Sequence, residues 1–257
     1  MSLNFERVGR FLCKVDGGAY NNKIISVSSS LGDEKDDYQK PFTKLTLKDG
    51  KFQQLPDPET ERQILYITGA SGSGKSTYTA NYIKQYQRMF PKNPIYCFSA
   101  LQEDESLDVV KPKRIIIDES IWKEPLMVDE FANSLVVLDD IDVIGDKKQR
   151  EAVYTIMNQI LEVGRHHKIT CIITNHLPTA GKDTRRVLNE CHSVTYFPHS
   201  GTARGIKYLL TEYLGIDKHQ MKKIKDLKSR WATIFKNYPN VCMTEKDIWL
   251  SANDDDD

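Results

Sequence analysis

The segment GASGSGKS, residues 69–76, limits the possible folds of this chain more than any other feature of its sequence. It satisfies the pattern G-x-x-x-x-G-K-[ST], follows the apolar run QILYIT at residues 63–68, and precedes residues 76–90, where apolar side chains recur at helical spacing. A strand, a glycine-rich turn and a helix in that order gather the N–H groups of the turn at a helix N-terminus. We therefore predict a phosphate-binding loop rather than a chance glycine-rich turn.

Each part of this loop has a predicted task in binding a nucleotide. Lys75 supplies a cation for the β and γ phosphates, and the hydroxyl of Ser76 is a predicted ligand of Mg²⁺. The glycines permit the backbone angles that aim N–H groups at the β phosphate. The cofactors predicted from the loop are ATP and Mg²⁺. The residues predicted to bind the nucleotide are Gly69, Ser71, Gly72, Ser73, Gly74, Lys75, Ser76 and Thr77.

Strand-like runs alternate with helical patterns from residue 62 onward, which predicts an α/β fold with a doubly wound, mainly parallel sheet and helices on both faces. The helical segment at 147–164 carries one apolar stripe and ends at Gly164, a residue suited to a helix C-terminus. The runs that read as buried strands are residues 63–68, 94–99, 114–118, 134–139, 169–174 and 193–197.

The regions outside this alternation have different compositions. Residues 1–60 contain four short strand-like pieces, at 10–15, 23–28, 42–47 and 51–56, separated by turn clusters. This pattern predicts a small β-rich appendage joined at LPDPETE to a core at 61–200. Residues 201–250 form a predicted basic helical and hairpin extension that packs on the sheet. The tail at 251–257, ending in four aspartates, is predicted to be solvated and disordered.

The segment SLVVLDDID, residues 134–142, places two carboxylates at the tip of a buried-type strand. A bound Mg²⁺ needs an acidic partner on a neighbouring strand, and hydrolysis needs a residue that orients or deprotonates water. We predict Asp139 as the metal acid, acting through water, and Asp140 as the catalytic acid. Two alternatives stay open. In the first, the acidic pair has no role beyond capping the next helix. In the second, the segment RIIIDES places Asp118 and Glu119 in a similar position, and Glu119 is the reserve catalytic acid.

Polar residues beyond the next strand are candidates for sensing the γ phosphate. Asn175, in IITNHLP, is the predicted sensor, unless it only begins the turn ahead of Pro178. We expect His176 to be structural, because a single histidine beside an apolar strand usually is. Three arginines are candidate fingers acting on a neighbouring subunit's nucleotide, or else solvated surface residues: Arg165, Arg185 and Arg186, with the last two favoured.

Charge and cysteine usage exclude several classes of protein. Lysine plus arginine equals aspartate plus glutamate, 36 against 36, so net charge favours neither nucleic acid nor a membrane as partner. The five cysteines are scattered in apolar runs without disulfide or zinc spacing, which predicts reduced thiols in a cytosol-like compartment. No apolar stretch approaches the roughly 20 residues of a membrane-spanning helix, so we expect no integral membrane segment.

The motifs GASGSGKS, LVVLDDID, LEVGRHHKITCIITNH and DTRRVLNECHSVTYF, in that order, resemble the FtsK/HerA superfamily of P-loop ATPases over residues 62–200. The likeness is greatest to the genome-packaging ATPases of large double-stranded DNA viruses of the poxvirus and giant-virus type. The resemblance places phosphate binding on Gly74, Lys75 and Ser76, the metal acid on Asp139, the catalytic acid on Asp140 and the sensor on Asn175. Asp140 departs from the glutamate that many relatives carry.

That resemblance also implies partners. It implies a homo-oligomeric ring, a hexamer, that pumps double-stranded DNA into a preformed capsid, with arginine fingers donated in trans and a capsid or portal partner. The implied location is the cytoplasm of an infected host cell or the virion.

An independent feature of the C-terminal region fits DNA. One predicted helix has a basic face and an opposite apolar face. The basic face carries Lys218, Lys222 and Lys225, and the apolar face carries Met221, Ile224 and Leu227. Such a basic stripe either contacts DNA phosphates or faces solvent. Two other functions remain open, a small-molecule P-loop kinase and a nucleotide-gated binding module without turnover.

Overall fold

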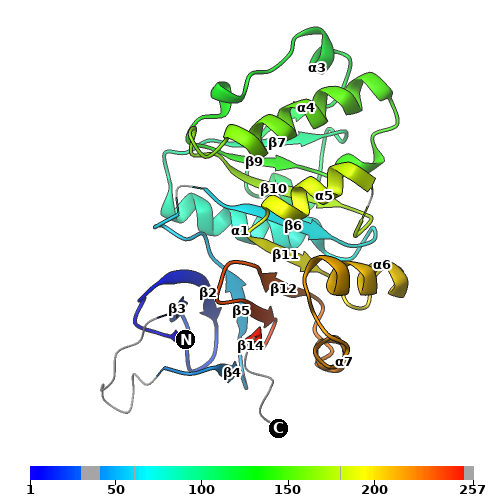
Figure 1. Ribbon diagram of the computed structural model, residues 1–257. Coiled ribbons are helices and arrows are strands. Elements are labelled where there is room, and N and C mark those ends of the chain that lie inside the picture. The colour runs from blue at the N-terminus through cyan, green and yellow to red at the C-terminus, as the bar shows by residue number, and fades with distance from the viewer. Residues whose placement is uncertain (30–40, 61, 180, 252–257) are drawn as a thin grey trace.

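The computed structural model describes residues 1–29, 41–60, 62–179 and 181–251 (Figure 1). Residues 252–257 of the predicted acidic tail lie outside the described residues. The described chain forms a ten-stranded sheet flanked by helices and a separate four-stranded sheet.

The six predicted buried runs form the parallel half of the large sheet, in the order β11-β6-β10-β9-β7-β8. The prediction of a mainly parallel sheet is therefore confirmed. Apolar, β-branched runs suit strands that are covered on both faces, and every residue of β6 is buried. The parallel strands are β6 (Ile64–Thr68), β7 (Ile95–Ser99), β8 (Lys113–Ile116), β9 (Leu135–Leu138), β10 (Thr170–Asn175) and β11 (Ser193–Tyr196).

Helices cover both faces of this sheet (Figure 1). On β6, Ile64 and Tyr66 pack into one apolar cluster and Leu65 and Ile67 into another, as the alternation of a strand requires. Helix α1 (Lys75–Met89) contributes to the second cluster, whereas α4 (Lys147–Val163) and α5 (Gly181–Glu190) contribute to the first. The parallel sheet is thus doubly wound, as predicted.

The C-terminal strands differ from the sequence-based expectation. Instead of packing on the sheet, residues 230–250 continue it edge to edge with three antiparallel strands: β12 (Ala232–Phe235), β13 (Val241–Thr244) and β14 (Asp247–Leu250). The first of them pairs with β11. Strand β4 (Lys44–Thr46) comes from the N-terminal region but pairs with β14, so it completes the large sheet rather than the small one.

The small sheet has the order β1-β3-β2-β5 and packs against this antiparallel extension. Leu12 and Phe52 of the small sheet share one apolar cluster with Phe235 and Met243 of the large one. Only β1 had no predicted counterpart. The strands are β1 (Ser2–Asn4), β2 (Arg10–Asp16), β3 (Ile24–Ser28) and β5 (Lys51–Gln54).

The remaining segments are short. They are α2 (Glu105–Asp108), α3 (Ser120–Lys123), η1 (Val128–Phe131), η2 (Ile141–Val143), α6 (Ala203–Tyr208), the π-helical η3 (Leu209–Tyr213) and α7 (Lys218–Asp226). None of the described helices is long and apolar enough to cross a bilayer.

Candidate nucleotide-binding site

The glycine-rich segment forms the turn between β6 and α1. Gly72 and Gly74 have φ angles of 74° and 109°, values that favour glycine. Gly69 is required for a different reason, because an added Cβ would lie 2.6 Å from Ser73 Oγ and 2.7 Å from a ring carbon of Phe197. Helix α1 begins directly after Gly74, so its unpaired N–H groups face the turn.

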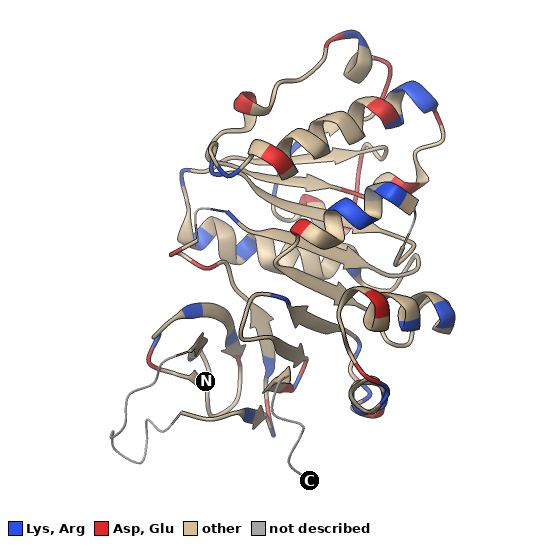
Figure 2. Cartoon of the chain, viewed as in Figure 1, with Lys and Arg blue, Asp and Glu red and all other residues tan. Residues whose placement is uncertain are grey.

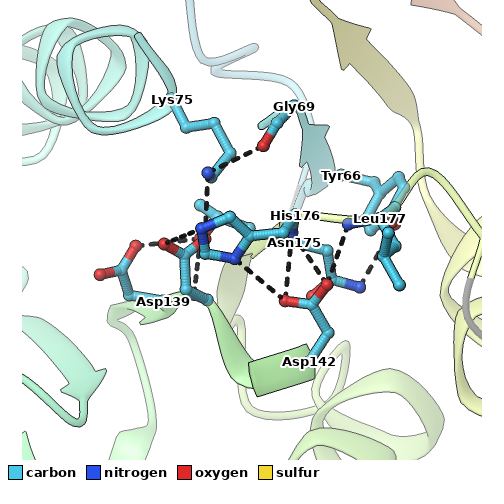
Figure 3. Close-up of polar contacts among 10 residues, drawn as sticks. Tyr66, Gly69, Lys75, Asp139, Asp142, Asn175, His176 and Leu177 are labelled. Atoms are coloured by element: carbon cyan, nitrogen blue, oxygen red, sulfur yellow. Dashed lines mark hydrogen bonds and ion pairs between the residues drawn. The ribbon is translucent and has the colours of Figure 1, made fainter. Parts of the chain in front are cut away.

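Lys75 points back across the turn (Figure 3). Its ammonium group donates to the carbonyl oxygen of Gly69 at 2.9 Å and lies 3.3 Å from a carboxylate oxygen of Asp140. The lysine side chain is only 6% exposed. The structure therefore places the predicted phosphate-binding cation next to the predicted catalytic acid, although 65 residues separate them in the sequence.

The acidic pair follows β9, which is not the immediate neighbour of β6. Strand β10 lies between them, so the expectation of acids on an adjacent strand is wrong in this respect. Asp139 is buried, and its backbone N–H donates to the carbonyl oxygen of Phe98. Burial, and then the Asp140 carboxylate, raises the pKa of Asp139 to about 6. Asp140 has a left-handed backbone, with φ 46° and ψ 45°.

Thr174 of β10 connects the two acids, and the sequence analysis did not single it out. Its hydroxyl lies 2.9 Å from an oxygen of Asp139 and 3.1 Å from one of Asp140. The backbone N–H of Asp140 donates to the same hydroxyl at 2.7 Å. Its position directly before the predicted sensor was the only signal for this residue in the sequence.

Asn175 ends β10 and is buried beside the start of the loop (Figure 3). Its carbonyl oxygen accepts from the backbone N–H of Gly69 at 3.1 Å, and its side-chain amide donates to the hydroxyl of Tyr66 at 3.2 Å. That hydroxyl donates to the carbonyl oxygen of Leu177 at 3.0 Å. The predicted sensor is therefore held firmly at the edge of the sheet where the loop begins.

His176 and Asp142 also belong to this cluster. Asp142 accepts from the backbone N–H groups of His176 and Leu177. The imidazole lies between two carboxylates, with Nε2 3.5 Å from Asp140 and Nδ1 3.6 Å from Asp142. One atom from each of these three side chains could contact a single metal ion. His176 was predicted to be structural because a single histidine beside an apolar strand usually is. Its acidic neighbours belong to a segment about 34 residues away, and only the fold brings them to the imidazole.

The rival acids lie elsewhere. Asp118 and Glu119 follow β8, the edge strand of the parallel half, with β7, β9 and β10 between it and β6. Asp118 accepts hydrogen bonds from Ser120, and Glu119 pairs with Lys123 at 2.8 Å. The geometry thus favours Asp140 over Glu119 as the acid that acts at the loop.

The three candidate arginines do not meet Lys75 within one chain. Arg165 precedes β10, at the end of that strand opposite Asn175. Arg186 pairs with Glu162 at 3.0 Å, and Arg185 is exposed on the same helix, α5, where basic residues gather in Figure 2.

The basic stripe predicted near the C-terminus lies on α7. Lys218, Lys222 and Lys225 are exposed, whereas Ile224 is buried. Leu227, predicted on the apolar face, lies after the helix and is exposed.

The residues of the site fit a magnesium-bound nucleotide. Ser73 Oγ and Asn175 Oδ1 are buried and have no hydrogen-bond partner among the described residues. A buried polar atom without a partner destabilises the fold, and a bound ligand can supply the missing hydrogen bond. Ser76 is half-buried at the start of α1, on the same loop as Lys75. A hydroxyl and a carboxylate are oxygen donors, the kind that Mg²⁺ prefers.

Comparison with known proteins agrees with this fold. Over 239 residues the chain is 41% identical to a protein of the Sputnik virophage called uncharacterized protein V3, covering 92% of this chain and 94% of that protein. No protein-family model matches the sequence.

Two of the solved structures that this chain resembles illustrate the extent of the overlap. The genome packaging NTPase B204 from Sulfolobus turreted icosahedral virus 2, in complex with sulfate, gives a TM-score of 0.50 at 16% identity, over 73% of this chain and 96% of that one. The cytoplasmic domain of the Thermomonospora curvata type VII secretion ATPase EccC gives 0.53 at 12% identity, over 80% and 28%. At such identities the likeness concerns the fold, which is that of a P-loop NTPase, as the motifs predicted.

Proposed function

The chain belongs to the same family as the Sputnik virophage protein V3, and from this premise we propose that it is an ATP-driven motor that moves double-stranded DNA into a viral capsid. One observation carries the proposal. Lys75 of the phosphate-binding loop lies 3.3 Å from Asp140, in a fold shared with a viral genome packaging NTPase. A cation and an acid at that distance can serve the same phosphate group and the water that attacks it.

The predicted site residues then have separate roles. Magnesium bound to ATP neutralises the charge of the β and γ phosphates. Ser76 and Asp139 hold the metal, and Lys75 supplies positive charge to the phosphates. Asp140 orients and deprotonates the attacking water. The hydrogen bonds with Thr174 hold Asp140 in position. Asn175, buried at the start of the loop, contacts the γ phosphate.

A ring of identical subunits completes this proposal. Because Arg165, Arg185 and Arg186 lie away from Lys75 in their own chain, a finger comes from a neighbouring subunit in the hexamer. The exposed lysines of α7 contact DNA phosphates. The proposed setting is the cytoplasm of an infected cell, with a capsid or portal as partner, because the similar protein V3 belongs to a virophage.

DNA-stimulated ATP hydrolysis tests the proposal. We expect duplex DNA to accelerate phosphate release by the wild-type protein, and Lys75→Ala and Asp140→Asn to lower the rate to background. Lys84→Ala, which removes an exposed lysine from the same helix, should hydrolyse ATP at the wild-type rate.

Other outcomes of the same assay would refute the motor. Transfer of phosphate to a small metabolite would instead identify a kinase. Tight nucleotide binding without hydrolysis, with or without DNA, would identify a nucleotide-gated binding module.

A further inference from the structure

An open cavity of about 130 Å³ lies beside the phosphate-binding loop. It is on the β11 side of β6, because Phe197 and Trp231 line it, whereas Asp139 and Asp140 lie on the β10 side. Resting on the proposed function, we propose that this cavity binds the purine base and ribose of the nucleotide, and that β5 of the N-terminal sheet forms one of its walls.

The cavity is continuous with the loop that would hold the phosphates. Ser73, Gly74 and Thr77 line it, and these residues belong to the turn and to the first turn of α1. The acids fill the other side of the loop, where Lys75 turns toward Asp140. A nucleotide whose triphosphate lies in the turn therefore has this cavity as the open space for its sugar and base.

The far walls have the chemistry that a purine requires. Trp231 lines the cavity and packs edge-on against Tyr78, with ring centroids 5.1 Å apart and an interplanar angle of 75°. Aromatic and guanidinium groups stack on bases, and exposed Arg230 adjoins Trp231. The amides of Gln53 and Asn81 both donate and accept hydrogen bonds, as do the edges of a purine.

The wall from β5 is fixed to the loop helix. The hydroxyl of Tyr78, on α1, donates to Gln54 of β5 at 2.7 Å and shares a hydrogen bond with Thr233 of β12 at 2.8 Å. Gln54 in turn donates to Ser193 of β11 at 3.0 Å. These buried contacts join α1, β5, β11 and β12, which meet below α1 in Figure 1, where the parallel strands of the large sheet pass into its antiparallel extension. The N-terminal sheet is thereby a structural part of the nucleotide site.

Binding of two probes separates this proposal from the general one. Magnesium ATP and magnesium tripolyphosphate share the phosphate chain, but only ATP carries a base and a sugar. Titration calorimetry of the full chain should show tighter binding of ATP than of tripolyphosphate. Trp231→Leu and Arg230→Ala should weaken ATP binding by about tenfold while leaving tripolyphosphate binding unchanged.

Controls keep the test decisive. Lys246→Ala removes an exposed lysine from the turn between β13 and β14, outside this cavity, and should preserve both affinities. Asn81→Ala supplies a third cavity variant whose half-exposed side chain is easily replaced, in case Trp231→Leu does not fold. Trp231 fluorescence, read in a background that carries both Trp122→Phe and Trp249→Phe, should change on adding ATP and not on adding tripolyphosphate.

Two results would overturn the base-binding proposal and leave the motor intact. One is equal affinity of the wild type for both probes, and the other is an unchanged affinity ratio in every folded cavity variant. Lys75→Ala distinguishes loss of phosphate binding from loss of base binding, because it should abolish binding of both probes. Failure of the wild type to bind either probe would refute the proposed function together with this inference.

Discussion

The buried carboxylate of Asp139 should destabilise the nucleotide-free fold at neutral pH. Its pKa is raised from 3.8 to about 6 by burial and by Asp140. The folded state therefore holds the proton more tightly than the unfolded chain. The protonated Asp139 carboxyl therefore contributes to the free energy of unfolding in full below pH 3.8, and this contribution is lost as the pH rises through 6. Near pH 8 the ionised carboxylate costs about 3 kcal/mol, since each pKa unit corresponds to about 1.4 kcal/mol.

Asp139→Asn should remove this cost. Asparagine has nearly the same shape, carries no charge, and keeps an oxygen that can accept from Thr174, which lies 2.9 Å from the carboxylate. We expect the free energy of unfolding to rise by about 3 kcal/mol at pH 8 and by about half as much at pH 5. Urea denaturation at the two pH values, without nucleotide or Mg²⁺, measures both quantities.

Asp49→Asn is the matched control, because it removes a carboxylate from an exposed turn. Its unfolding free energy should stay within about 0.5 kcal/mol of the wild type at both pH values. If Asp139→Asn is no more stable than the wild type at pH 8, or if its gain is the same at pH 5, the reasoning from burial is refuted. Added Mg²⁺ and ATP should reverse the order, because the variant lacks the metal acid.

Three further predictions follow from packing and hydrogen bonding. Burial lowers the pKa of His192 to about 4, so this histidine should contribute a loss of about 3 kcal/mol of stability between pH 7 and pH 4, and in urea denaturation His192→Asn should lack that loss when compared with the wild type at both pH values. Gly69→Ala should abolish ATP binding in calorimetry, because its Cβ would collide with Ser73, whereas Gly145→Ala, with open space around it, should bind normally. Thr174→Val should lower the ATPase rate while Thr174→Ser keeps it, since only serine restores the hydroxyl between the acids; equal rates would contradict this role.

The fold class could be predicted because its signals are local. Strands covered on both faces read as unbroken apolar runs, and α4 shows one buried stripe with Val153, Ile156 and Ile160. The order of the strands could not be predicted in this way. Nothing in the segment at 169–174 says that it inserts between β6 and β9, because strand pairing depends on contacts between residues far apart in the chain.

The residues of the candidate site also fall into two groups, those that local sequence patterns predict and those that depend on strand pairing. Lys75, Asp139 and Asn175 were identified from their own segments, since each follows or begins a recognisable element. Thr174 and His176 were not, because a threonine inside a strand and a histidine beside one have many ordinary explanations. Their part in the site depends on β10 lying next to β9, which brings them to the acids.

The sequence pattern also could not predict that the C-terminal strands extend the large sheet at its edge. Residues 230–250 were read correctly as strand-forming, but whether such strands lie on a sheet or continue its edge is decided by which backbone groups find partners. The same holds for β4, whose partner β14 is about 200 residues away along the chain.

By itself, the sequence determined the phosphate-binding turn and the alternation of strands and helices, because steric limits on glycine and the periodicity of apolar residues act over a few neighbouring residues. Only the tertiary structure decided which acid faces Lys75, which side of the loop is open, and that the N-terminal sheet borders it. Those outcomes depend on pairing and packing between distant segments, whose free energy no single stretch of sequence contains.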